Sequence, residues 1–171
     1  LADVDADGDL DLVVGGRIPP DGGEGAQNVL FFRNDGSPTS PTFTYVQEAE
    51  NPFSALAARD ASDNPVAPTI ALGDVTDDGA GEAFTVGAVP DSLVYYYPNV
   101  GTPAAPGYGA PRTSGGDGNP VPFDAEGRHF QDGEVRLTAV DVDIDGMLDL
   151  IVGYDSGNGG RLRFLENTGS A

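Results

Sequence analysis

The stretch DVDADGDLDLVVGG, residues 3–16, joins a dense cluster of aspartates to a segment with the character of a buried strand. Aspartate stands at every second position from Asp3 to Asp11, and an apolar run that ends in glycine follows at once. Carboxylates at this density repel one another unless a cation neutralises them or solvent screens them. The regular spacing favours a cation, and the apolar run is typical of a buried β-strand.

The same pattern recurs along the chain. The segments are LADVDADGDLDLVVGG, ALGDVTDDGAGEAFTVGA and AVDVDIDGMLDLIVGY, and each precedes an aromatic strand and an Asn-x-Gly sequence. When Asp3, Asp74 and Asp141 are taken as equivalent, the repeat is about 70 residues long. A repeat of this kind indicates that one supersecondary unit stacks on the next.

The repeat predicts the strands of each unit. Strands are expected at residues 10–15, 29–33, 43–47 and 68–72 in the first unit, at 83–87 and 93–97 in the second, and at 148–153 and 161–165 in the third. Four antiparallel strands per unit are typical of propeller blades. We therefore expect an all-β fold of about three tandem, four-stranded, blade-like repeats, open ended, within one domain over residues 1–171. The units are residues 1–70, 71–137 and 138–171, the last incomplete.

Two of the acidic loops carry the pattern of a calcium site. Counted from the first aspartate, positions 1, 3, 5 and 9 are Asp3, Asp5, Asp7 and Asp11 in the first loop, and Asp141, Asp143, Asp145 and Asp149 in the third. Odd positions of a tightly curled loop point inward, and glycine at position 6 permits the positive φ that returns position 9 to the ion. Position 7, Asp9 or Met147, is predicted to offer its backbone carbonyl. Hard oxygen ligands without His or Cys favour Ca²⁺ over Mg²⁺, so two Ca²⁺ sites are predicted.

The second loop departs from this pattern. Its positions 1, 3, 5, 7 and 9 are Asp74, Thr76, Asp78, Ala80 and Glu82. Because Thr76 replaces a carboxylate, a third Ca²⁺ site here is predicted to be weak or empty. Acidic β-turns without an ion are the alternative for all three loops, since Asp and Gly are common turn residues. An EF-hand is not expected, because position 12 is Val14 in the first loop and Val152 in the third, where an EF-hand has a bidentate glutamate, and no flanking helices are predicted.

The loops DVDADGDLDLVVG and DVDIDGMLDLIVG, with the following FFRNDGS and FLENTGS, resemble the FG-GAP or VCBS repeat, which is related to the blades of integrin-α-type propellers. The resemblance covers almost the whole chain. It implies Ca²⁺ held between strands of a blade by the aspartates of the first and third loops, while Thr76 interrupts the match in the second. It also implies an extracellular propeller used for adhesion, ligand binding or scaffolding.

The composition limits the partners and the kinds of site that the chain can have. The formal net charge is −20, from 28 acidic and 8 basic residues, so nucleic acid is not an expected partner and cations are. The chain has no cysteine, which excludes disulfides, thiolate metal sites and cysteine nucleophiles. No apolar run approaches the roughly 20 residues that a membrane-spanning helix needs, so no membrane span is expected.

The ends of the chain fall within repeats, and three units are fewer than the roughly four to eight blades of closed propellers. We therefore expect either a piece of a longer array or a protomer that self-associates into a filament-like polymer.

The favoured function is a calcium-binding, extracellular β-repeat module with a structural or adhesive role and no catalytic activity. A lectin-like module that binds glycans through residues 17–27 or 107–124 is the alternative. A hydrolase or lyase on a propeller frame is third, and it requires convergent carboxylates or the sole histidine, His129, in a concave pocket. His129 is expected to be a surface or ion-paired residue, because arginine and acidic residues flank it.

Overall fold

A computed structural model describes residues 1–17, 27–56, 58–59, 65–87, 94–112, 135–155 and 159–167. The regular secondary structure of these residues consists of β-strands alone, which confirms the all-β prediction. The strands are β1 (Leu12–Arg17), β2 (Gln27–Asn34), β3 (Phe43–Val46), β4 (Ala58–Arg59), β5 (Pro65–Val66), β6 (Pro68–Gly73), β7 (Glu82–Gly87), β8 (Val94–Tyr97), β9 (Val135–Val140), β10 (Asp149–Asp155) and β11 (Gly160–Leu165).

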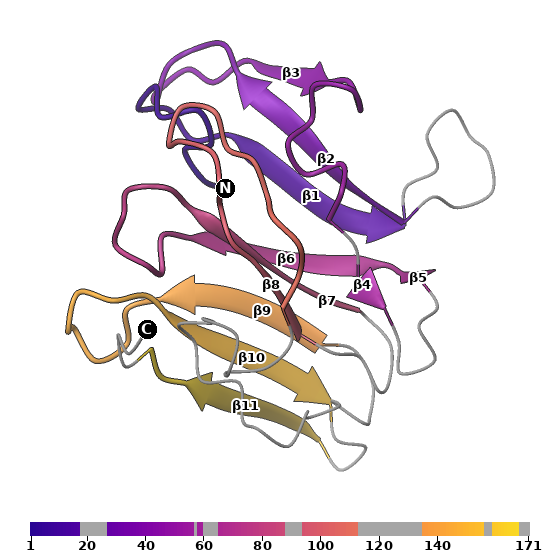
Figure 1. The fold of residues 1–171 in the computed structure, drawn as a ribbon, viewed down its shortest axis with the longest axis vertical. Coiled ribbons are helices and arrows are strands. Elements are labelled where there is room, and N and C mark those ends of the chain that lie inside the picture. The colour runs from indigo at the N-terminus through magenta and orange to yellow at the C-terminus, as the bar shows by residue number, and fades with distance from the viewer. Residues whose placement is uncertain are drawn as a thin grey trace.

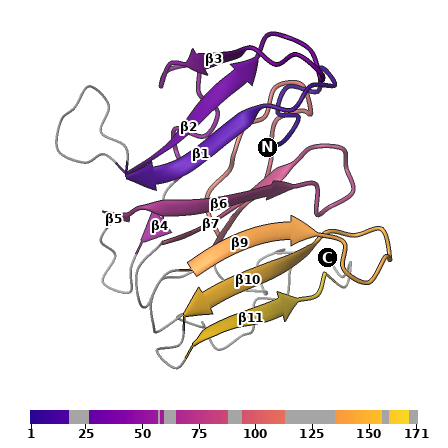
Figure 2. The ribbon, with the colours of Figure 1, turned by 180° about the vertical axis from the view of Figure 1, so that it is seen from behind.

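The strands form three antiparallel, three-stranded sheets and one short β4–β5 pair. The first sheet has the order β1-β2-β3, the second β6-β7-β8 and the third β11-β10-β9. Strand residues alternate between two faces, as β2 illustrates: Val29 and Phe31 are buried, whereas Leu30 and Phe32 on the opposite face are partly exposed. The sheets lie one above another in the order first, second, third (Figures 1 and 2).

The prediction that residues 68–72 form the fourth strand of the first unit is wrong. This strand, β6, pairs with β7 of the second sheet, from Pro68 opposite Gly87 to Gly73 opposite Glu82. The acidic loop between β6 and β7 is a short hairpin connection, and strands joined in this way pair with each other. The expected unit boundaries at residues 70 and 137 therefore fall inside β6 and β9.

Four-stranded blades and propeller closure are not seen in the described residues, whose larger sheets have three strands each. In the second sheet a single bridge joins Tyr96 of β8 to Arg112, with backbone hydrogen bonds of 2.9 and 2.8 Å. In the first sheet the bridge between Ala2 and Asp11 extends the pairing on the other side of β1.

The core lies in two layers, one on each face of the second sheet. Towards the first sheet, Ala83 and Tyr97 pack with Val29, Phe31 and Phe53. The Phe31 and Phe53 rings meet edge to face with centroids 5.6 Å apart. Burial of each such side chain contributes about 1.5–3 kcal/mol to folding.

The second core layer lies between the second and third sheets. It joins Phe84 and Val86 to Leu150 and Val152, all of them buried. Every residue of β7 is buried, so this strand is covered on both faces, as strands between neighbouring blades are expected to be.

All three acidic loops lie along one side of the molecule, at the left in Figure 1 and at the right in Figure 2. They precede β1, β7 and β10, so the stacking of the sheets places them in a row. Nothing helical in the described part of the chain has the length and apolarity to cross a membrane.

Candidate metal centres

The three acidic loops share a curl in which the carboxylate at position 1 accepts the backbone N–H of the glycine at position 6. In the first loop the carboxylate of Asp3 accepts hydrogen bonds from the backbone N–H groups of Asp7 and Gly8, each at 3.1 Å. In the third loop Asp141 accepts the corresponding bond from Gly146 at 3.0 Å. The glycine at position 6 has φ of 93° in both loops and 85° at Gly79, as the sequence predicts.

Position 4 also adopts the left-handed conformation, which the sequence pattern does not predict. Ala6, Asp77 and Ile144 have φ of 58°, 57° and 65°. This conformation is unfavourable for residues other than glycine, and most of all for a β-branched side chain. The same conformation in three loops of different sequence indicates that the curl is part of the fold.

The acidic residue at position 9 anchors each loop to the start of its strand. Asp11 is 1% exposed, and its carboxylate accepts hydrogen bonds from the backbone N–H groups of Val4 at 2.9 Å and Asn34 at 2.7 Å. Asp149 is also 1% exposed and accepts the equivalent bonds from Val142 at 2.9 Å and Asn167 at 2.8 Å. Each oxygen keeps a lone pair for a further partner.

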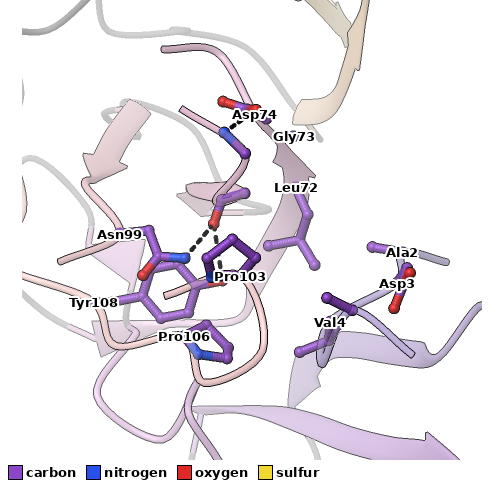
Figure 3. Close-up of a pocket in the computed structure, with 13 residues that line it drawn as sticks. Ala2, Asp3, Val4, Leu72, Gly73, Asp74, Asn99, Pro103, Pro106 and Tyr108 are labelled. Atoms are coloured by element: carbon purple, nitrogen blue, oxygen red, sulfur yellow. Dashed lines mark hydrogen bonds between the residues drawn. The ribbon is translucent and has the colours of Figure 1, made fainter. Parts of the chain in front are cut away.

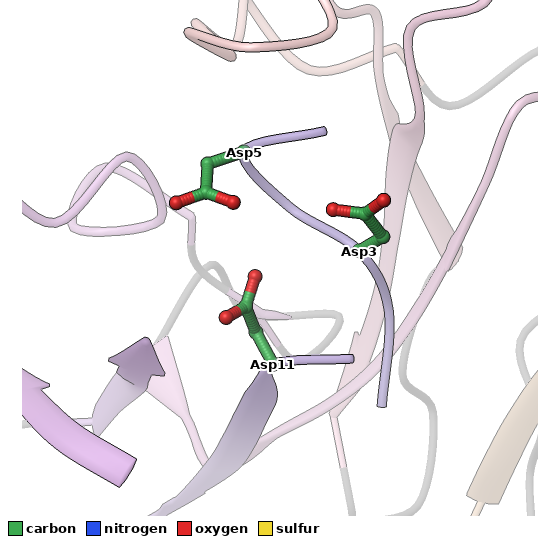
Figure 4. A group of neighbouring side chains, drawn as sticks. All are labelled: Asp3, Asp5 and Asp11. Atoms are coloured by element: carbon green, nitrogen blue, oxygen red, sulfur yellow. The ribbon is translucent and has the colours of Figure 1, made fainter. Parts of the chain in front are cut away.

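Positions 1, 3 and 9 bring three carboxylates together in two of the loops. The groups are Asp3, Asp5 and Asp11 in the first loop, and Asp141, Asp143 and Asp149 in the third. In each group one oxygen from every carboxylate lies within 4.8 Å of the others. In Figure 4 the carboxylates of Asp3, Asp5 and Asp11 surround a common space. Two unit charges about 4 Å apart repel by about 1 kcal/mol in water and about 4 kcal/mol near a protein surface.

Asp5 carries a second sign of a cation site. Its Oδ1 atom is buried and has no hydrogen-bond partner among the described residues. Burial, followed by the charges of Asp11, Asp7 and Asp3, raises the pKa of the Asp5 carboxyl above its ordinary value. A buried carboxylate oxygen without a donor is costly, and a hard cation would supply the missing partner. The residues present therefore fit a divalent ion that prefers oxygen ligands.

Positions 5 and 7 stand apart from these groups. Asp7 Oδ1 accepts the backbone N–H of Asp9 at 2.9 Å, and Asp145 Oδ1 accepts that of Met147 at 2.8 Å. Neither Asp7 nor Asp145 joins the three-carboxylate groups. Burial, then the charges of Asp7, Asp3 and Asp11, raises the pKa of the Asp9 carboxyl. The roles of the Asp9 and Met147 backbone carbonyls as ligands stay predictions.

The second loop keeps the curl without the three-carboxylate group. Asp74 accepts the backbone N–H groups of Asp78 at 3.2 Å and Gly79 at 2.7 Å. At position 9, Glu82 accepts the Val75 N–H at 2.9 Å and the Thr76 hydroxyl at 3.4 Å. Ala80, at position 7, is buried.

The environment of Glu82 differs from that of the position 9 aspartates. Burial is the main cause that raises the pKa of Glu82 from 4.5 to about 7, with further contributions from Asp78 and Asp74. Of the described residues, only those of the first and third loops form a three-carboxylate group. That the second loop binds calcium weakly or not at all stays a prediction.

An asparagine side chain holds the back of each loop, a contact that the acidic loop pattern alone does not predict; we call it the asparagine clasp. The side-chain amides of Asn34, Asn99 and Asn167 donate to the carbonyl of the residue before position 9: Leu10 at 3.5 Å, Gly81 at 3.2 Å and Leu148 at 3.2 Å. The amide of Asn167 also donates to the Val75 carbonyl at 2.8 Å, so it joins the second and third loops. The signal was the recurring Asn-x-Gly sequence, which could have been recognised as structural.

A cavity of about 250 Å³ lies between the first and second loops (Figure 3). Asp3 and Asp74 line it together with Pro103, Pro106 and Tyr108. The Tyr108 hydroxyl donates to the Gly81 carbonyl at 3.4 Å. Burial, followed by the charge of Glu82, raises the pKa of this phenol above its ordinary value.

Three predicted features lie outside the described residues. They are His129, most of the loop at 17–27 and the part of the loop at 107–124 that follows Arg112.

Comparison of the chain with models of known protein families, with curated proteins and with solved structures gives no match. The resemblance to FG-GAP and VCBS repeats therefore rests on the loop sequences, and membership of that family stays a prediction.

Proposed function

We propose that the chain is a calcium-binding, extracellular β-repeat module of the FG-GAP or VCBS type, with a structural or adhesive role. The observation that carries the proposal is the pair of three-aspartate groups at positions 1, 3 and 9 of the first and third loops. The buried Asp5 Oδ1 supports it, because this oxygen has no hydrogen-bond partner in the part of the chain that the structure describes and needs a cation or donor.

The bound ions would stabilise the fold. In each site position 1 belongs to the loop and position 9 to the base of a strand, so an ion held by both closes the loop onto its sheet. It would also relieve the repulsion between the carboxylates. Extracellular Ca²⁺, at about millimolar concentration, is sufficient for weak loop sites. In this proposal the module works through its bound ions and its surfaces, without catalysis.

A carbohydrate-binding role is the second candidate. The cavity beside the first and second loops supports it, because Asp3, Asp74 and Tyr108 line it. Against it, the Tyr108 ring stacks on Phe53 with centroids 5.3 Å apart, so one face of this aromatic ring is used in the core. Binding to a glycan array that is lost on Pro103→Asp would favour this role over the structural one.

Isothermal titration of the chelator-treated chain with CaCl₂ tests the first proposal. We expect two sites in the unchanged chain, one fewer in Asp5→Asn and one fewer in Asp143→Asn. Both changes keep the side-chain shape and remove one charge. Asp78→Asn in the second loop is the matched control and should leave both sites. A chain that binds no Ca²⁺, or variants that bind as the unchanged chain does, would contradict the proposal.

A further inference from the structure

The two sheet–sheet interfaces of the fold use the same register positions. In the first sheet Val13 of β1 pairs with Phe31 of β2, and in the second sheet Phe84 of β7 pairs with Tyr96 of β8. Val13 and Phe84 each lie two residues after the position 9 acid. These pairs face the next sheet along the stack: Phe31 packs in the first core layer and Phe84 and Tyr96 in the second.

The third sheet leaves the equivalent positions exposed at Leu162 and Phe164 and partly exposed at Ile151. Ile151 lies two residues after Asp149 and pairs with Phe164 of β11, while Leu162 pairs with Gly153. Phe164 is 45% exposed and Leu162 is 81% exposed. The residues equivalent to Leu162 in the first two sheets, Val29 and Val94, are only 2% and 6% exposed. We call Ile151, Leu162 and Phe164 the forward face.

The first sheet exposes the opposite half of this interface. Leu12 pairs with Phe32, which pairs with Tyr45 of β3. Leu12 and Phe32 are partly exposed, and Tyr45 is 40% exposed. We call these three residues the backward face. The Phe32 and Tyr45 rings lie 5.5 Å apart, so they form one apolar surface.

The equivalents of the backward face are buried in the other two sheets. Ala83 and Tyr97 in the second sheet are 0% and 4% exposed, and Leu150 and Leu165 in the third are 1% and 8% exposed. In both sheets these residues pack against the preceding sheet of the stack. Each end of the stack thus carries one half of an interface that the interior forms twice.

We infer that the forward face of one molecule binds the backward face of a second copy, head to tail. The occupant is a second copy because its first sheet supplies the half-interface that the third sheet lacks among the described residues, with apolar residues at the register positions that the interior interfaces use. The two halves are different surfaces, so the contact is heterologous and leaves one free half at each end of a dimer. This inference deepens the proposed function. The contact is argued from the two faces alone, and only the structural or adhesive role of the assembly rests on the proposed function.

Sedimentation equilibrium of the unchanged chain and of two single variants tests the inference. Leu162→Asp blocks the forward face and Tyr45→Asp blocks the backward face; both side chains are exposed, so each change leaves the core intact. Val100→Asp is the matched control, because Val100 is 71% exposed and lies outside both faces. This substitution adds the same charge as the two face variants. Circular dichroism verifies that each variant is folded.

We expect the unchanged chain and Val100→Asp to grow in mass with concentration. Each face variant should weaken self-association by at least about tenfold. An equimolar mixture of the two face variants should form a dimer that grows no further, because one intact forward face meets one intact backward face. A dimer of Tyr45→Asp alone would overturn the inference in favour of contact between two third sheets.

A monomeric unchanged chain, a monomeric control or a mixture that stays monomeric would also overturn the inference. Calcium titration of the same samples separates it from the proposed function. Calcium binding by a chain that never associates refutes the head-to-tail contact alone, and association by a chain that binds no Ca²⁺ refutes the calcium proposal alone.

Discussion

The backbone N–H of Asn167 donates a 2.8 Å hydrogen bond to Oδ1 of Asp149, at the base of the third acidic loop. The side chain of the same asparagine reaches Val75 in the second loop. One residue therefore orients a carboxylate of the candidate metal site and holds two neighbouring sheets together.

Asn167→Ala should destabilise the fold by at least about 2 kcal/mol, because it leaves two carbonyl acceptors without their donor in a site that is 0% exposed. Urea unfolding measures the change. The neighbouring, exposed Glu166→Ala is the control and should stay within about 0.5 kcal/mol of the unchanged chain. Equal unfolding midpoints for the two variants would show that the clasp contributes little.

Removal of calcium should lower the melting temperature. A site in about 100-fold excess of Ca²⁺ over its Kd adds about 2.7 kcal/mol to folding stability. For a chain of this size that corresponds to roughly 5–10 °C per site. Thermal unfolding in CaCl₂ and in chelator measures the difference.

The double variant Asp5→Asn/Asp143→Asn provides the control for this experiment. It should lose most of the calcium-dependent gain, and in chelator it should melt above the unchanged chain because the carboxylate repulsion is reduced. Identical melting curves of the unchanged chain in both buffers would exclude stabilisation by calcium.

The sequence predicted the strands that follow each acidic loop to within a few residues, because apolar alternation bounded by glycine and acidic residues is a local signal. It did not predict the partner of β6, because the alternation of apolar residues does not say which sheet a strand joins. The short acidic loop that connects β6 to β7 favours pairing between these two strands. The carboxylates at positions 1, 3 and 9 converge as expected. Asp7 and Asp145 do not join these groups, and each accepts the backbone N–H two residues further along the chain.

The pH dependence of stability in calcium-free buffer should report Glu82. Below pH 4.5 the carboxyl is protonated in both the folded and unfolded chain. Between pH 4.5 and about 7 the unfolded chain releases this proton and the folded chain retains it, so the free energy of unfolding falls as pH rises. Above about pH 7 both states are ionised and the loss is complete.

Glu82→Gln should remove this contribution and gain about 1–3 kcal/mol over the unchanged chain at pH 8, but not at pH 4. Chemical unfolding at several pH values measures it. The exposed Glu48→Gln is the control. If the unfolding free energies of Glu82→Gln and the unchanged chain changed with pH in parallel, the assignment of this pH dependence to Glu82 would be contradicted.

Ile144→Asn should stabilise the third loop by about 0.5–1 kcal/mol, because asparagine tolerates the left-handed conformation better than a β-branched residue. The side chain is 88% exposed, so no core packing is lost. Ile144→Thr is the control: it is also polar but keeps the β-branch, and it should give no gain. Urea midpoints compare the three chains, and an equal gain in both variants would assign the effect to polarity.

Thr76→Asp should create a third calcium site. The second loop already has the curl of the other two, with Asp74 bonded to the N–H of Gly79 and Glu82 anchored to that of Val75. What it lacks is the carboxylate at position 3, where the other loops hold Asp5 and Asp143. The added charge should destabilise the chain in chelator, because it lies beside Glu82, and calcium should restore the lost stability.

Titration calorimetry of Thr76→Asp should count three calcium sites. The control Thr76→Asn, of similar shape and without the charge, should keep two. Two sites in both variants would show that the longer Glu82 at position 9, and not Thr76, prevents binding in this loop.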